Sequence, residues 1–260
     1  MLQWDLLGET SVRFAAGPDA SLVWASAAIG ACTLPLVMHD FRRAAVLGNA
    51  TLLMAWRRPV LLTAAHVFDT GARLGNLMIP LPGGRGFASL AAARLARSRS
   101  VDIAVIDISG VAGVDELVSG MRAAPLSRAR LDRSRRARTP RHGRARVMVS
   151  GYPAALSRFE RGWLAARRFT LLTDRHHETA AIHCPADRLF GYGRVARRHD
   201  GVAIHTPELD GMSGAGIWVL EGAADEGAVS LRLDAVQSAY VHGRYLRGHD
   251  IGAAAELFGP

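Results

Sequence analysis

Three short segments of the chain carry side chains that together can perform nucleophilic catalysis. They are "LLTAAHVF" with His66, "VDIAVIDI" with Asp102 and "LDGMSGAG" with Ser213. A serine hydroxyl is a weak nucleophile at neutral pH and needs an adjacent base. A histidine, with an ordinary pKa of about 6.5, can take the hydroxyl proton, and a carboxylate can orient that histidine. The order His, Asp, Ser along a chain is one of several in which these residues perform acyl transfer.

The glycines around Ser213 also need a reason, because glycine is costly in ordered chain unless the backbone uses its freedom. Gly211, Gly214 and Gly216 surround this one hydroxyl. An α/β-hydrolase also sets a serine between glycines, but its elbow reads Gly-x-Ser-x-Gly, and position 215 is alanine. In that class the histidine also follows the serine in the chain, so we reject this alternative.

The three motifs together resemble those of the trypsin-like (chymotrypsin-fold) serine proteases. "TAAH" (63–66) matches the histidine motif of that family, and "DIAV" (102–105) matches its aspartate motif. "GMSGAG" (211–216) is similar to its Gly-x-Ser-Gly-Gly serine motif. "GYP" (151–153) resembles the opening of the family's second barrel. The resemblance covers about residues 45–255, which is nearly the whole chain.

The resemblance implies an all-β fold of two antiparallel six-stranded β-barrels with a short C-terminal helix. Residues 1–121 would form the barrel with the histidine and the aspartate, and residues 147–260 the barrel with the serine. Residues 122–146 would be an arginine-rich connector between them. Many short apolar runs separated by turn signals, with little helical pattern, favour antiparallel β structure on their own account.

The resemblance also implies the role of each site residue. His66, Asp102 and Ser213 would be the catalytic residues of a serine endopeptidase that works through an acyl-enzyme intermediate. The backbone N–H groups of Gly211 and Ser213 would bind the oxyanion of the tetrahedral intermediate. No cofactor is implied, and the expected partner is a protein or peptide substrate. The alternative is a catalytically silent or partner-activated module of this fold that acts in binding or regulation.

Two positions depart from the secreted members of the family. Met212 stands where the digestive enzymes have an aspartate that pairs with a newly cut N-terminus, so activation by that route is not expected. Val67 follows the histidine in place of a cysteine. Both features resemble bacterial, intracellular-type relatives. Ala215 replaces the second glycine of the serine motif, a small change that we expect to be tolerated.

Substrate specificity is less determined. By resemblance, Pro207 or Glu208 lies at the base of the pocket that receives the side chain before the scissile bond. Ser238, Ala239 and Tyr240 form its other wall, with Ser238 offering its backbone to the substrate as an added strand. Glu208 at the base would favour cleavage after Arg or Lys, but a loop acid is more often simply solvated. Tyr240 could instead narrow the pocket and favour small residues.

Local patterns predict the elements that carry these motifs. The runs 51–56 and 59–65 read as two strands of a tight hairpin with Arg57 and Arg58 between them. Residues 89–97 fit either a helix or a strand. We expect a short terminal helix over 250–258, capped by its first aspartate. The uncharged stretch 21–38 is interpreted as buried β structure and an entry loop, and not as a membrane helix.

The positive charge is concentrated in one segment. All 32 basic residues counted toward the net charge of +9 are arginines. The segment 122–146 carries ten of them against one acid, and elsewhere arginines and acids balance in number. The segment has no interleaved aromatic residues for base stacking, so a solvated connector is favoured over a nucleic-acid-binding surface.

Cysteine and histidine usage gives no sign of a metal site or a disulfide framework. Cys32 and Cys184 are too few for such a framework, although they leave room for one bridge. His176, His177 and His183 with Cys184 fit no zinc spacing, so no metal is expected. The start "MLQWDLLGETSVRF" lacks the basic beginning of a secretory signal, which predicts a cytoplasmic protein. The oligomeric state is not predicted.

Overall fold

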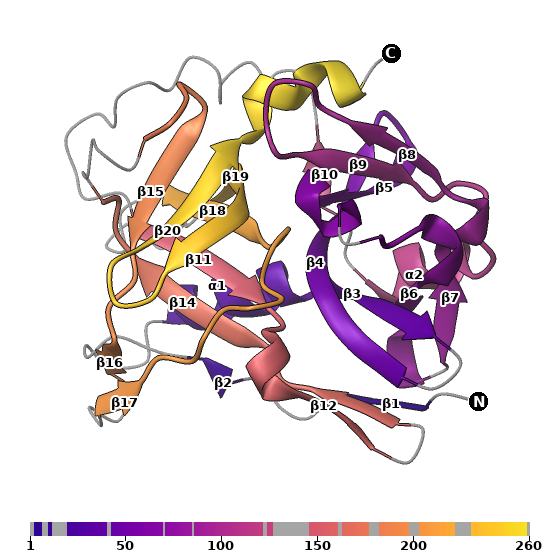
Figure 1. Cartoon of the computed structure of the whole chain (residues 1–260), viewed down its shortest axis with the longest axis horizontal. Helices are drawn as coiled ribbons and strands as arrows, with labels where there is room; N and C mark the ends of the chain where they lie inside the picture. Colours follow the sequence, from indigo (N-terminus) through magenta and orange to yellow (C-terminus); the bar gives the residue numbers. More distant parts are fainter. Residues whose placement is uncertain are drawn as a thin grey trace.

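Two curled, mostly antiparallel sheets dominate the computed structural model and lie side by side (Figure 1). The structure describes residues 3–6, 10–11, 20–40, 43–69, 71–84, 86–121, 124–126, 146–160, 163–176, 182–197, 203–221 and 230–258. The expected all-β architecture with a short C-terminal helix is confirmed. The arginine-rich segment lies outside the described residues over 122–123 and 127–145. Its role as a connector, and the division at 121 and 147, stay predictions.

The first sheet, drawn in purple, has the order β7-β6-β3-β4-β5-β9-β8, with β10 pairing in parallel with β4. Its strands are β3 (Thr33–Asp40), β4 (Arg43–Ala55), β5 (Arg58–Thr63), β6 (Leu77–Pro80), β7 (Phe87–Ser89), β8 (Arg94–Arg97), β9 (Ala104–Asp107) and β10 (Ala124–Leu126). The ambiguous stretch 89–97 therefore ends as a strand, after the short 3-10 helix η4 (Leu90–Ala92).

The second sheet, drawn from pink through orange to yellow except for the indigo β2, has the order β15-β20-β19-β18-β11-β14-β2. Its strands are β2 (Thr10–Ser11), β11 (Arg146–Gly151), β14 (Phe169–Thr173), β15 (Asp187–Gly191), β18 (Gly216–Glu221), β19 (Ser230–Val241) and β20 (Tyr245–Asp250). A bridge between Arg175 and Phe190 joins the end of β14 to β15. This bridge brings the two flanks of the sheet together, so the second sheet curls almost fully onto itself.

The remaining elements are short. A three-stranded sheet has the order β1-β13-β12, and a hairpin pairs β16 with β17. These strands are β1 (Gln3–Leu6), β12 (Ser157–Glu160), β13 (Trp163–Ala166), β16 (Val195–Arg197) and β17 (Ala203–His205). Besides η4, the helices in the described part of the chain are α1 (Ala20–Gly30), α2 (Val114–Gly120), η1 (Ala65–Phe68), η2 (Leu74–Asn76), η3 (Pro82–Gly84), η5 (Ala154–Leu156) and η8 (Ile251–Phe258).

The hairpin of β4 and β5 determines where the first candidate catalytic residue emerges. Its two-residue turn is Trp56–Arg57, one position earlier than expected, and both residues have positive φ angles of 47° and 68°. Such a turn matches the twist of the flanking strands, so it fixes their register, with Thr51 opposite Leu62. The end of β5 is thereby held against the middle of β4.

The stretch 21–38 corrects one sequence prediction. Its first part is not β structure but belongs to the helix α1, which packs against β3 and β11. Ala25 and Ile29, four residues apart, are buried, whereas Val23 and Trp24 are exposed. The stretch is uncharged, so its sequence shows little polar contrast between the two faces, and a one-sided helix is hard to recognise. Within the part of the chain that the structure describes, no helix is long and apolar enough to span a membrane.

The core continues from one sheet into the other. The largest buried cluster contains side chains of the first sheet together with Met148, Trp218 and Val236 of the second. The C-terminal helix η8 returns to the first sheet and packs near β9. Asp250 caps it as expected, because its Oδ1 accepts a hydrogen bond of 2.7 Å from the Gly252 N–H. Cys32 and Cys184 are both free thiols.

Candidate active site

His66 lies where β5 runs into the 3-10 helix η1. The side chains on either side of this turn decide its direction. Val67 and Phe68 are buried in the core, so the turn is anchored from within and the His66 ring is left partly exposed. Thr63, the last residue of β5, is fully buried, and its hydroxyl donates to the Asn49 carbonyl oxygen of β4 at 2.6 Å. The base of the turn is therefore tied to the neighbouring strand.

Asp102 lies just before β9, next to β5 in the same sheet. Both of its carboxylate oxygens bond to His66. Oδ1 accepts from the His66 backbone N–H at 2.8 Å, and Oδ2 lies 2.5 Å from Nδ1 of the ring. Two contacts to one residue fix the plane of the imidazole and favour the tautomer that carries its proton on Nδ1.

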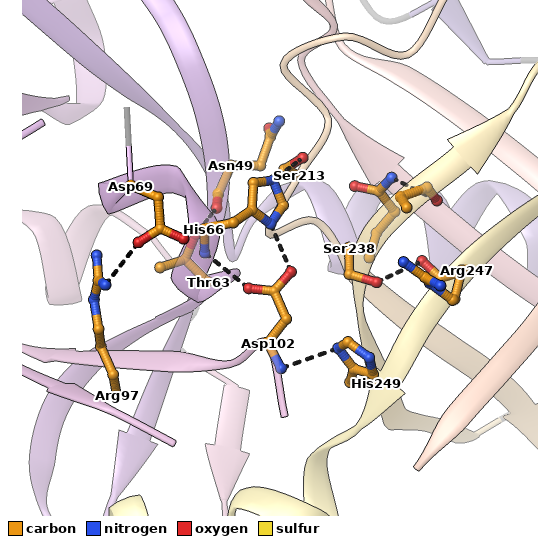
Figure 2. Close-up of polar contacts among 12 residues, drawn as sticks. Asn49, Thr63, His66, Asp69, Arg97, Asp102, Ser213, Ser238, Arg247 and His249 are labelled. Carbon is orange, nitrogen blue, oxygen red and sulfur yellow. Dashed lines mark hydrogen bonds and ion pairs between the residues drawn. The ribbon is translucent and has the colours of Figure 1, made fainter. Parts of the chain in front are cut away.

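Ser213 comes from the second sheet, in the loop that precedes β18. Its Oγ lies 2.9 Å from His66 Nε2, on the far side of the ring from Asp102. Figure 2 shows the three side chains in a row, with the imidazole in the middle. The fold thus brings together the three residues that sequence analysis singled out, and they meet where the two sheets adjoin (Figure 2).

The surroundings shift the pKa values of His66 and Asp102 in opposite directions. The hydrogen bond that the His66 ring donates to Asp102 raises the pKa of His66 above its usual value, and burial only partly opposes this. Burial acts to raise the pKa of Asp102, but its hydrogen bonds with the side chain and backbone of His66 lower the pKa overall. Asp102 is therefore an anion near neutral pH that favours protonated His66.

Gly214 explains part of the glycine pattern. Its φ angle is +92°, in the region that favours glycine. A Cβ at this position would lie 2.0 Å from the Asn49 carbonyl oxygen and 2.2 Å from the Thr63 hydroxyl. The loop carrying Ser213 therefore packs directly on the backbone of the first sheet, and a side chain at 214 would push the serine away from His66.

The N–H groups beside the serine hydroxyl are available for a ligand. Among the residues that the structure describes, the amides of Gly211 and Ser213 donate to no protein group. The amides between and after them are used, since Met212 donates to the Leu209 carbonyl at 2.8 Å and Gly214 donates to that of Gln237. Two unengaged donors next to a nucleophile are suited to stabilise a developing oxyanion.

The predicted substrate-binding residues lie close to this loop. The Ser238 hydroxyl donates to the Arg247 carbonyl oxygen at 3.3 Å and does not reach Asp102 (Figure 2). The Tyr240 ring packs edge-on against Tyr192, with 6.3 Å between the ring centres. The Tyr192 hydroxyl donates to the Pro207 carbonyl oxygen. An aromatic pair thus lies beside the segment that leads into the serine loop.

Glu208 and Ala239 differ in their surroundings. The Glu208 side chain is exposed, as is usual for a solvated loop acid. Ala239 pairs with Arg247 on β20, directly after a β-bulge that begins at Gln237. The role of all these residues in binding a substrate stays a prediction.

Two residues of the site were missed by sequence analysis. His249 of β20 accepts a hydrogen bond at its Nδ1 from the Asp102 backbone N–H at 3.2 Å (Figure 2). Its Nε2 lies 2.9 Å from Oδ1 of the buried Asp187. Asn49 is fully buried beside the serine loop. Neither residue belongs to a catalytic motif, and the side chain of each bonds to partners more than 50 positions away, so no local pattern pointed to a role in the site.

The potential ligand atoms of Cys184, Asp187 and His249 lie within 4.8 Å of one another. They already bond among themselves, since the Cys184 thiol donates to Asp187 Oδ1 at 3.3 Å, the same oxygen that contacts His249. Asp187 also accepts from the backbone N–H groups of His183 and Cys184. The cluster is thus a satisfied hydrogen-bond network that supports His249 behind Asp102.

Comparisons with known proteins bear on the fold. No family model matches the sequence, and no curated protein matches it. Solved structures do match. One is a mutant of human heparin binding protein, with a TM-score of 0.53 and 13% sequence identity over 97% of this chain and 94% of that chain. The fold is chymotrypsin-like. Likeness at this identity shows the fold alone, so a bacterial, intracellular-type origin stays a prediction of the sequence.

Proposed function

We propose that this chymotrypsin-like chain is a serine endopeptidase with Ser213 as nucleophile, His66 as general base and acid, and Asp102 as the group that orients His66. One observation carries the proposal: the continuous hydrogen-bonded row from the Ser213 hydroxyl through both ring nitrogens of His66 to Asp102. A protein that used this surface only for binding would not need three titratable or nucleophilic groups aligned in this way.

The proposed reaction begins when Ser213 Oγ attacks the carbonyl carbon of the scissile peptide and its proton passes to His66 Nε2. The carbonyl oxygen becomes an oxyanion, which the N–H groups of Gly211 and Ser213 stabilise. His66 then gives its proton to the leaving amine, and an ester with Ser213 remains. Water attacks this ester with His66 again as base, and the carboxylic acid product leaves. Asp102 stays ionised throughout.

We propose further that the substrate lies as an extra strand along residues 238–240 and that a small side chain precedes the scissile bond. Strand addition uses main-chain hydrogen bonds and is a common mode of peptide recognition. The packing of Tyr240 on Tyr192 supports a narrow pocket. The exposure of Glu208 argues against a buried acid that would select Arg or Lys.

Labelling with a fluorophosphonate probe tests the proposed nucleophile. The wild-type protein should be labelled at Ser213, and Ser213→Ala and His66→Ala should each abolish labelling. Ser89→Ala is a matched control, because this serine caps η4 on the first sheet and should leave labelling unchanged. A folded wild-type protein that never reacts would favour the alternative of a silent or partner-activated module.

A further inference from the structure

The loop 209–213 has all of its carbonyl oxygens engaged while its oxyanion-facing amides are left unengaged. Each of the five carbonyls accepts a hydrogen bond, and the donors in order are the Met212 N–H, the Ala154 N–H, the Asn49 side chain, the Ala215 N–H and the Asn49 N–H. Three of these donors, the Ala154 N–H and the side-chain and backbone N–H groups of Asn49, lie in distant segments of the chain. The loop is therefore held from outside through its carbonyl groups.

The bond from Ala154 controls the direction of the Gly211 amide. The Asp210 carbonyl and the Gly211 N–H belong to one planar trans peptide, so they point in opposite directions. The Ala154 N–H holds the Asp210 oxygen at 2.7 Å. A flip of this peptide would break that bond and aim the carbonyl oxygen where the N–H now points. Gly211, which follows this peptide bond, has a φ angle of +81°, a left-handed conformation that glycine adopts easily.

Asn49 holds the next peptide and connects it to the same segment. Its Nδ2 donates to the Gly211 oxygen at 2.6 Å and to the Tyr152 oxygen at 3.3 Å, while its Oδ1 accepts from the Tyr152 N–H at 2.8 Å. Both neighbours of Nδ2 are pure acceptors and the neighbour of Oδ1 is a donor, so only this orientation of the amide satisfies all three bonds. The Asn49 backbone N–H also bonds the Ser213 oxygen at 2.7 Å.

Met212 packs in an apolar cluster and carries no charge for an ion pair. Met212 is buried and apolar, so it can hold the loop only by packing. A Cβ on Gly151 would lie 2.8 Å from Met212 Sδ and 3.0 Å from Asn49 Oδ1. The glycine of "GYP" therefore lets the segment 151–154 approach closely enough for Asn49 to bond it. The same approach brings the Ala154 N–H to Asp210.

We infer that Asn49 and the Ala154 N–H are the positioning groups of the oxyanion site: together they hold the Gly211 amide in its catalytic direction without an ion pair at position 212. This inference rests on the proposed function. It assigns to the first sheet, through Asn49, a direct part in shaping the serine loop of the second.

Ala154→Pro tests the inference by removing one N–H. Ala154 is the first residue of η5, where proline is tolerated, and the preceding Pro153 has a ψ of 145°, which suits a residue before proline. We expect kcat on a peptide ester to fall about 100-fold, as when an oxyanion donor is lost, with little change in KM. Affinity for a peptide boronate, which forms a tetrahedral adduct, should fall in parallel. Ala154→Ser keeps the N–H and separates its loss from loss of the methyl group.

Asn49→Asp tests the side chain, because it keeps the shape but replaces the donor to Gly211 with a carboxylate oxygen. The same fall in kcat at constant KM is expected. Asn76→Asp, where the side chain accepts from the Arg73 N–H in an exposed contact, is the matched control. Variants that melt like the wild type yet keep kcat within twofold, or that change only KM, would overturn the inference.

A spectroscopic measurement keeps this test separate from the test of the proposed function. In protein labelled with 15N-glycine, the Gly211 amide resonance should move in Ala154→Pro and Asn49→Asp, even if the wild type proved inactive. An unchanged resonance in the folded variants would overturn the positioning role. If neither variant folds, 15N-asparagine labelling of the wild type decides: slow exchange of the Asn49 side-chain protons is expected, and fast exchange with water would contradict the inference.

Discussion

At the scale of single residues, His66 is the group whose chemistry depends most on its neighbours. Its pKa is raised chiefly by the hydrogen bond that its ring donates to Asp102, and Asp69 adds a weaker electrostatic effect. Only neutral imidazole can act as base, so kcat/KM should rise with pH, with a midpoint above the ordinary pKa of about 6.5. Because the folded state favours protonated His66, this residue stabilises the fold fully below about pH 6.5, and that contribution is lost as the pH rises through the raised pKa.

Asp102→Asn tests this interpretation. The substitution removes the anion, so the midpoint of the kcat/KM profile should move to lower pH, and kcat should fall about 10⁴-fold as His66 loses its tautomer. Asp69→Asn is the matched variant, because its carboxylate bonds to Arg97 at 2.8 Å and not to the His66 ring. It should shift the midpoint less and leave kcat nearly unchanged. A midpoint unaffected by Asp102→Asn would contradict the assigned cause.

Tyr240 is the residue on which the proposed substrate class depends. Replacing it with alanine removes a ring that packs against Tyr192, so Tyr240→Ala should widen the pocket. We expect kcat/KM for substrates with Phe or Leu before the scissile bond to rise relative to Ala by about 10-fold, in a peptide-library cleavage profile. Tyr245→Ala, which removes a ring stacked on His176, should leave the profile unchanged. An unaltered preference in Tyr240→Ala would place the pocket elsewhere.

At the scale of elements, strands were more predictable than the contacts between them. The runs around β4, β5, β9 and β11 were recognisable because β-branched and apolar residues alternate with turn signals. The helix α1 was not, because its uncharged sequence conceals which face is buried. The serine loop combines a feature that was predictable with a contact that was not. Its glycines signalled unusual backbone, but the partner that makes Gly214 necessary is the carbonyl of Asn49, 165 positions earlier.

The candidate site was predictable to the extent that it is encoded in local motifs. His66, Asp102 and Ser213 each stand in a short recognisable segment. Asn49 and His249 do not, because their function depends on distances across the junction of the two sheets, which pairing and core packing create. These distances can be read only from the complete fold and not from a local stretch of sequence. Groups that position the catalytic residues are therefore harder to predict than the catalytic residues themselves.

At the scale of the whole molecule, the site is assembled by contacts that cross between the sheets. Asn49 reaches from β4 to Gly211 and Tyr152, and His249 reaches from β20 to the backbone of Asp102. His249 also contacts the buried carboxylate of Asp187. Burial would raise the pKa of this carboxylate, but hydrogen bonds from backbone N–H groups and from the Cys184 thiol lower the pKa overall. Asp187 is thus an anion that anchors His249, and the relative position of the sheets is coupled to the orientation of Asp102.

His249→Ala tests this coupling. It leaves the Asp102 N–H without its acceptor and removes one partner of buried Asp187, so the free energy of unfolding should fall by about 1–3 kcal/mol. The kcat should also fall, because Asp102 is less firmly held against His66. Urea denaturation and steady-state kinetics measure the two effects. His205→Ala, an exposed position on β17, is the control. If His249→Ala lost stability but kept its kcat and the pH midpoint of kcat/KM, the contact would join the sheets without positioning Asp102.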